Sequence, residues 1–180
     1  MNGRRNGKGK EYNYDGKLEF EGEYLNGKRN GKGKEYNKNG KLKFEGEYLN
    51  GKRWNGKGYN QNGIIDFEIK NGNGKGKDYN EFGVLKFEGE FLNGQINGNA
   101  KEYYYDGELI FEGEYLNGER NGKGKEYNKT GKLKFEGEYL NGQRNRNSKE
   151  YYYNGKLKFE GEYLNGKRNG KGKEYNIMVN

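Results

Sequence analysis

The chain has 180 residues, with 35 Lys or Arg against 27 Asp or Glu, a net charge of +8, and no Cys, His or Pro. Without Cys and His, the sequence excludes a thiol nucleophile, a Ser-His-Asp relay, a structural zinc site and a haem ligand set. Leu, Ile, Val and Phe number only 29, a level typical of disordered chains, but the 18 Tyr and 9 Phe are not.

No targeting or membrane-spanning segment is apparent. The longest apolar runs hold two or three residues, far short of the ~20 that cross a bilayer. The N-terminus carries neither the apolar stretch of a signal peptide nor a myristoylation glycine. We therefore expect a cytoplasmic protein, peripheral at most to a membrane or to the cytoskeleton.

A single motif is repeated along the chain. Phe-Glu recurs mostly every 24 residues, after a half repeat over residues 1–19. Self-similarity at this period is the signature of a solenoid, so we expect one tandem-repeat domain over residues 1–180. The repeats start at residues 20, 44, 67, 87, 111, 135 and 159.

Each repeat is predicted to form two strands. Over residues 42–48, Leu, Phe, Gly and Tyr alternate with Lys and Glu, the period of a half-buried strand. Asn50-Gly51 follows, and Asn-Gly favours the positive φ angles of a tight hairpin turn. A second strand is predicted over Gly31–Tyr36, closed by a turn at Asn39-Gly40.

One repeat cannot fold alone, because its few apolar side chains stabilise by roughly 2 kcal/mol each, against 1–2 kcal/mol of entropy per ordered residue. Stability must come from pairing between repeats. The predicted fold is therefore all-β, an elongated single-layer twisted ribbon or solenoid of about 15 short antiparallel strands. Gly31, Gly33 and Gly46 are expected to let aromatic rings lie on the backbone.

The motif resembles a known family. The stretch Phe-Glu-Gly-Glu-Tyr-Leu-Asn-Gly-Lys-Arg-Asn-Gly-Lys-Gly at residues 20–33 is similar to the MORN repeat, and its longer spacing is similar to a bacterial-type variant. The resemblance covers nearly the whole chain. It implies β-hairpin ribbons that scaffold protein partners, a debated binding of phosphoinositides, and homodimers formed through ribbon ends. MORN repeats also accompany plant-type phosphatidylinositol phosphate kinases, of which the chain could be the repeat part, although no kinase-like segment is present.

Several repeats depart from the pattern. The third is shortened at residues 67–72 and is the expected place of a bend or irregularity. Ala100 replaces a loop glycine in the fourth repeat, and Arg146 and Ser148 replace both in the sixth. Trp54, the only Trp, is inserted in a loop, where it is either a partner anchor or part of local hairpin packing.

Positive charge concentrates in the loop segments, which predicts a basic edge and an acidic remainder. The basic edge either only solvates the sheet and discourages aggregation, or binds anionic phospholipid or another polyanion. Nucleic acid is disfavoured because the aromatic residues follow the pattern that a sheet needs anyway. The candidate anion ligands are Arg4, Arg5, Lys28, Arg29, Lys32, Lys34, Lys52, Arg53, Lys167, Arg168, Lys171 and Lys173.

The leading functional hypothesis is a scaffold whose aromatic face forms a groove for a partner peptide or helix. A single-layer sheet is not expected to hide these rings fully. The uncapped ends also predict end-to-end homo-oligomers. The candidate groove residues are Phe20, Tyr24, Phe44, Tyr48, Phe111, Tyr115, Phe135, Tyr139, Phe159, Tyr163 and Trp54.

Two motifs that resemble catalytic ones are better explained by structure. Residues 27–33 are glycine-rich, but they lack the spacing of a phosphate-binding loop and lie in a hairpin. The Glu21 and Glu23 pair recurs along the chain, as a structural ladder does, whereas an active site is one unusual place. We expect no enzymatic activity, no cofactor and no metal.

Overall fold

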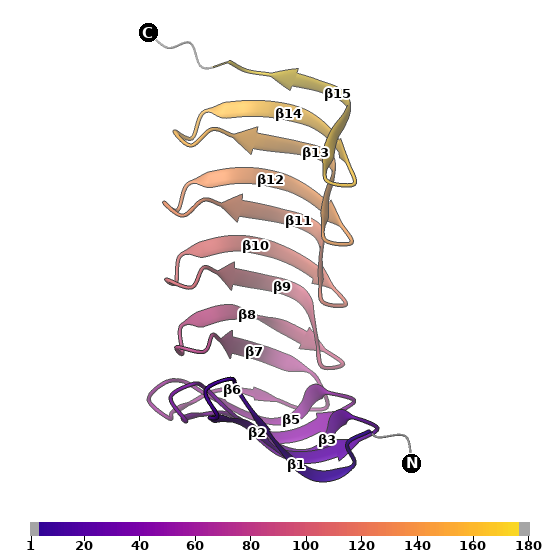
Figure 1. Ribbon diagram of the computed structural model, residues 1–180. Coiled ribbons are helices and arrows are strands. Elements are labelled where there is room, and N and C mark those ends of the chain that lie inside the picture. The colour runs from indigo at the N-terminus through magenta and orange to yellow at the C-terminus, as the bar shows by residue number, and fades with distance from the viewer. Residues whose placement is uncertain (1–3, 177–180) are drawn as a thin grey trace. The chain divides into compact units, whose positions relative to one another are not determined.

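The computed structural model describes residues 4–176, and its regular structure is entirely β (Figure 1). The predicted all-β architecture of about 15 short antiparallel strands is confirmed. No helix with the length and apolarity to span a membrane is found among these residues. The strands are β1 (Gly7–Tyr12), β2 (Leu18–Leu25), β3 (Lys28–Tyr36), β4 (Leu42–Leu49), β5 (Lys52–Tyr59), β6 (Ile65–Ile69), β7 (Gly74–Tyr79), β8 (Leu85–Leu92), β9 (Gln95–Tyr103), β10 (Leu109–Leu116), β11 (Glu119–Tyr127), β12 (Leu133–Leu140), β13 (Gln143–Tyr151), β14 (Leu157–Leu164) and β15 (Lys167–Glu174).

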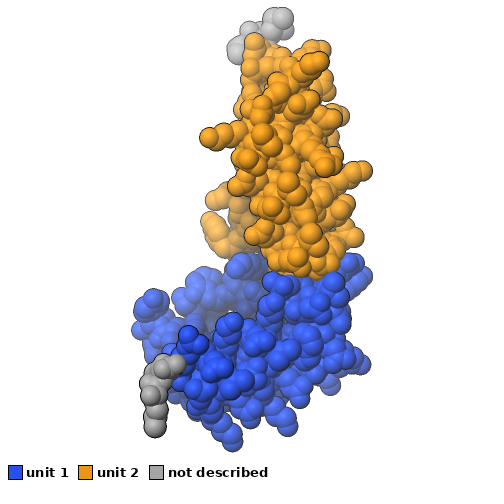
Figure 2. Space-filling view, turned by 90° about the vertical axis from the view of Figure 1, so that its right-hand side faces the viewer, with its two compact units in different colours: residues 1–95 blue, residues 96–180 orange. Residues whose placement is uncertain are grey.

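The strands pair in chain order into two open sheets, β1–β6 and β7–β15. By its contacts the chain divides into two compact units, unit 1 over residues 1–95 and unit 2 over residues 96–180 (Figure 2). Each unit consists of successive hairpins with similar sequences. The same side-chain contacts therefore recur within each unit.

Asn-Gly turns close the hairpins at one end. In unit 2, Asn117 and Gly118 have φ angles of +52° and +89°, the conformation that Asn-Gly favours. Successive turns are also joined, because the Gly142 N–H donates to the Arg120 carbonyl at 2.9 Å. This hydrogen bond fixes each turn onto the preceding repeat.

The turns at the other end of the hairpins are built on an asparagine side chain. Asn128 Oδ1 accepts hydrogen bonds from the Thr130 and Lys132 N–H groups at 3.0 and 3.1 Å. This local bonding is typical of asparagine in turns. In two repeats of unit 2 a tyrosine, Tyr104 or Tyr152, takes the place of this asparagine.

The glycines of the strands serve two purposes. A Cβ at Gly33 would lie 2.5 Å from Phe20 Cζ, so the predicted ring-on-glycine packing is confirmed there. Gly46 instead lies against the backbone of Asn55, and Gly31 has a φ of +96° beside a shift in strand register. For these two glycines the predicted reason was wrong, because close backbone approach and bulge geometry require them.

The shortened third repeat interrupts the sheet, as predicted. β6 and β7 belong to different sheets, and an isolated bridge between Lys70 and Asn73 lies between them. Within unit 1 the turn of this repeat reaches an earlier one. The Lys38 N–H donates to the Glu81 carbonyl at 3.3 Å, and the two side chains form an ion pair at 2.5 Å. Losing part of a strand therefore bends unit 1 at this repeat.

Candidate interaction surfaces

The aromatic face is a core. Phe111 and Phe135 have no exposed surface, and each ring meets a tyrosine of the following repeat edge-on, as Phe111 meets Tyr139 at 5.2 Å between centroids. The expectation that a single-layer sheet leaves these rings open is wrong, because neighbouring rings cover them. None of the ten predicted groove rings is more than 8% exposed: Phe20, Tyr24, Phe44, Tyr48, Phe111, Tyr115, Phe135, Tyr139, Phe159 and Tyr163.

An arginine covers the phenylalanine ring in most repeats. The Arg144 guanidinium lies 4.0 Å from the centroid of Phe135, and Arg120 lies at the same distance from Phe111. A cation over an aromatic face is attractive, more so when water is excluded. The arginines of this pattern therefore belong to the core and are not free loop charges.

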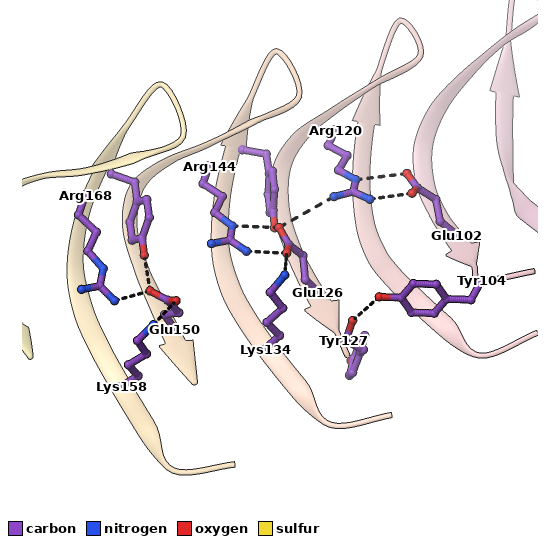
Figure 3. A network of polar contacts seen from close by, with 12 residues as sticks. Glu102, Tyr104, Arg120, Glu126, Tyr127, Lys134, Arg144, Glu150, Lys158 and Arg168 are labelled. Atoms are coloured by element: carbon purple, nitrogen blue, oxygen red, sulfur yellow. Dashed lines mark hydrogen bonds and ion pairs between the residues drawn. The ribbon is translucent and has the colours of Figure 1, made fainter. Parts of the chain in front are cut away.

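Each core arginine is also held by a glutamate 18 residues earlier in the chain (Figure 3). In unit 2, Arg144 donates two hydrogen bonds to Glu126, at 3.0 and 2.6 Å. The Tyr139 hydroxyl donates to the same carboxylate at 2.7 Å. Arg120 and Glu102 repeat the arrangement one hairpin earlier. In this Arg-Glu-Tyr network the part-buried polar side chains form hydrogen bonds with one another.

Unit 1 carries the same network up to its third repeat. Arg29 joins Glu11 and Glu35, at 2.5 and 3.1 Å. In the third repeat an aspartate, Asp78, occupies the position of this glutamate. The positions 13 and 18 residues after it hold Phe and Ile, where the other repeats have Tyr and Arg. Asp78 instead pairs with Lys43 at 2.6 Å and with Arg53. These pairs fasten the bent part of unit 1.

The network predicts sensitivity to acid. Burial alone would raise the pKa of Glu35, but the Arg53 guanidinium lowers it to about 2, well below the ordinary 4.5. Because the pKa is depressed on folding, this stabilisation is present above pH 4.5 and is lost as the pH falls towards 2. We expect the urea midpoint to drop between pH 5 and pH 3, and to drop less in Glu35→Gln. An equal drop in both proteins would contradict this origin.

The predicted anion ligands separate into two groups. Five of them, Arg5, Arg29, Lys34, Arg53 and Arg168, form ion pairs with glutamates and are therefore partly neutralised. In residues 4–176 no ion pair is formed by the others, and all of these but part-buried Lys52 are exposed. This second group is Arg4, Lys28, Lys32, Lys52, Lys167, Lys171 and Lys173.

Trp54 lies in strand β5 and not in a loop, so the predicted position was wrong. Its carbonyl accepts a hydrogen bond from the Gly72 N–H at 2.7 Å, and its ring lies against Gly72. The side chain is half-buried. Local packing thus accounts for the burial of part of this ring.

A row of exposed leucines was not among the predicted sites. In unit 2, Leu116, Leu140 and Leu164 end strands β10, β12 and β14 with 49%, 48% and 50% of their surface exposed. Each follows a buried tyrosine directly, so the pleat places it on the opposite, outer face. The sequence held this signal, because Leu and Tyr are adjacent in every such strand. We call these three residues the leucine row.

No preorganised metal site is present in the described part of the chain, where no group of three or more acidic side chains gathers. The surfaces of each unit instead repeat with the hairpins. Such a surface suits an extended partner better than one small molecule.

Comparison with protein families gives two matches. A model of the MORN repeat matches residues 20–41, 87–108, 111–132 and 159–176. A model of a MORN repeat variant matches residues 5–26 and 147–165. Together they cover more than half of the chain. A search of curated proteins finds no match.

Proposed function

Because the chain belongs to the MORN-repeat family, we propose that it is a non-enzymatic scaffold that binds a protein partner, a peptide or a helix. The observation that carries the proposal is the leucine row of unit 2, three half-exposed aliphatic side chains at matching positions of successive repeats. A row that repeats with the fold supports an extended contact. The buried aromatic rings shape the sheet behind this row instead of touching the partner.

The leucine row has enough apolar surface to matter. Covering three half-exposed leucines would contribute about 1 kcal/mol each. Single exposed leucines are ordinary on a protein surface, but a regular row of them is a sign of interaction. We therefore place the partner on the outer face of unit 2.

Removing the leucine row is expected to weaken binding by about tenfold to a hundredfold. The variant is Leu116→Ser, Leu140→Ser and Leu164→Ser. A partner recovered by cross-linking is purified and titrated by calorimetry against this variant. Tyr105→Ser with Tyr153→Ser, two exposed turn residues at the other end of the hairpins, is the control and should bind normally. Unchanged affinity in a folded leucine variant would contradict the proposal.

A second candidate function is binding to anionic phospholipid. It is favoured by exposed lysines that form no ion pair within residues 4–176, among them Lys28 and Lys32 in unit 1 and Lys167 and Lys171 in unit 2. We expect sedimentation with vesicles containing phosphatidylinositol 4,5-bisphosphate at low salt, weakening as salt rises. Changing these four lysines to Gln should abolish it. Salt-independent sedimentation, or none, would rule this function out.

Self-association and location stay predictions. Strand β15 is exposed along its whole length, which supports pairing with a second copy through that edge. We place the protein in the cytoplasm, where its partner or a membrane surface would recruit it.

A further inference from the structure

Two surface hollows open beside the leucine row of unit 2. One has a volume of about 530 Å³ and the other about 460 Å³. Both lie at equivalent points of the repeat. Each is lined by an asparagine, a glutamate and a leucine at matching positions: Asn99, Glu114 and Leu116 in the first, and Asn147, Glu162 and Leu164 in the second.

The hollows coincide with a change in the repeat itself. Across the paired strands, Glu114 faces Asn99 and Glu162 faces Asn147. In the repeat between them, the equivalent glutamate faces Lys123. The repeats of unit 1 also place a lysine opposite this glutamate, as at Lys32 and Lys75. Each hollow thus lies where these other repeats carry a lysine in place of the asparagine.

The substitution also removes a positive charge. Neither Glu114 nor Glu162 forms an ion pair within residues 4–176. Arg146 and Glu138 also line the second hollow, where they pair with each other at 3.3 Å and so leave Glu162 without a cation. Each hollow therefore presents a carboxylate that has no lysine opposite it on the preceding strand. A lysine or arginine from outside would supply a positive charge beside each of these carboxylates.

The spacing of the leucine row fits a helix. Equivalent residues lie two strands apart, or about 9.6 Å. Seven residues of an α-helix rise about 10.5 Å. The difference is less than ~2 Å over the whole row, which leucine side chains can absorb. A polyproline helix repeats at a similar distance, but it is bound by aromatic surfaces, whereas this row is aliphatic.

We infer that the partner is a basic amphipathic helix that crosses the strands of unit 2 on its outer face. Apolar residues at every seventh position would cover the leucine row. Two Lys or Arg residues about 14 positions apart, or ~21 Å, would enter the two hollows, which lie four strands or ~19 Å apart. The inference rests on the proposed function and specifies the kind of partner.

The probe is a fluorescent helical peptide of about 22 residues, with Leu at every seventh position and one Lys for each hollow. A second peptide has Gln in place of the two Lys. We expect the full-length protein to bind the Lys peptide about tenfold more tightly in an anisotropy titration, with the preference shrinking at high salt. Asn99→Lys with Asn147→Lys, which restores the common residue, should abolish the preference without changing affinity for the Gln peptide.

The matched control adds the same charge elsewhere. Tyr105→Lys with Tyr153→Lys also restores a residue found in other repeats, Lys129, at the opposite end of the hairpins, and should keep the preference. Equal binding of both peptides, or a preference that survives Asn99→Lys with Asn147→Lys, would overturn the inference and leave the scaffold standing. Tighter binding of a proline-rich peptide would overturn the helix. If the leucine variant still binds the natural partner normally, the proposed function itself fails.

Discussion

Phe135→Ala is expected to lower the free energy of unfolding by about 3–5 kcal/mol. The ring is fully buried, meets Tyr139 and Tyr163 edge-on at 5.6 and 5.4 Å, and supports the Arg144 guanidinium. In a fold one sheet thick, no second layer can collapse into the space that the ring leaves. Urea unfolding followed by far-ultraviolet circular dichroism measures the effect.

The control for this variant is Leu140→Ala. Leu140 lies five residues further along the same strand, with 48% of its surface exposed. Its replacement should change stability by less than about 1 kcal/mol. Similar losses from the two variants would mean that the aromatic face is not the core.

Glu126→Gln is expected to lower the free energy of unfolding by about 3 kcal/mol. The carboxylate accepts two hydrogen bonds from Arg144 and one from Tyr139, and its side chain is only 14% exposed. Removing one partner of a buried ion pair leaves the other charge without compensation, which is the costly change. Thermal and urea midpoints should both fall.

Glu138→Gln is the matched comparison for Glu126. Glu138 pairs with Arg146, whose side chain is 75% exposed, and such surface pairs contribute less than about 1 kcal/mol. The same Glu→Gln change is thus expected to affect stability differently at two positions that lie 12 residues apart in the sequence of one sheet. A loss at Glu138 as large as at Glu126 would contradict the assignment of the network to the core.

The strands, the turns and the irregular third repeat could be predicted because their signals are local. Alternation sets the strands, Asn-Gly sets the hairpin turns, and the missing Gly-x-Tyr pair marks the interruption between β6 and β7. The division into two compact units has no such local signal. The repeat pattern therefore predicts a single array over the whole chain.

The roles of the arginines could not be predicted from the local pattern. Arg144 follows a turn in a polar, basic stretch, where exposed charge is the ordinary expectation. Its partner Glu126 is 18 residues earlier, and their proximity appears only when the hairpins stack. The leucine row was missed for the opposite reason. Its signal is local, because Leu140 directly follows buried Tyr139 and therefore lies on the other face of the strand.

The reach of the contacts also has an evolutionary consequence. Arg144 bonds to Glu126 and the Gly142 N–H bonds to Arg120, so each link joins a hairpin to its immediate neighbour. Duplicating or deleting one whole 24-residue segment therefore recreates every link at the new junction. The number of repeats can therefore change during evolution while each hairpin keeps its contacts. The binding surface then lengthens or shortens by one repeat at a time.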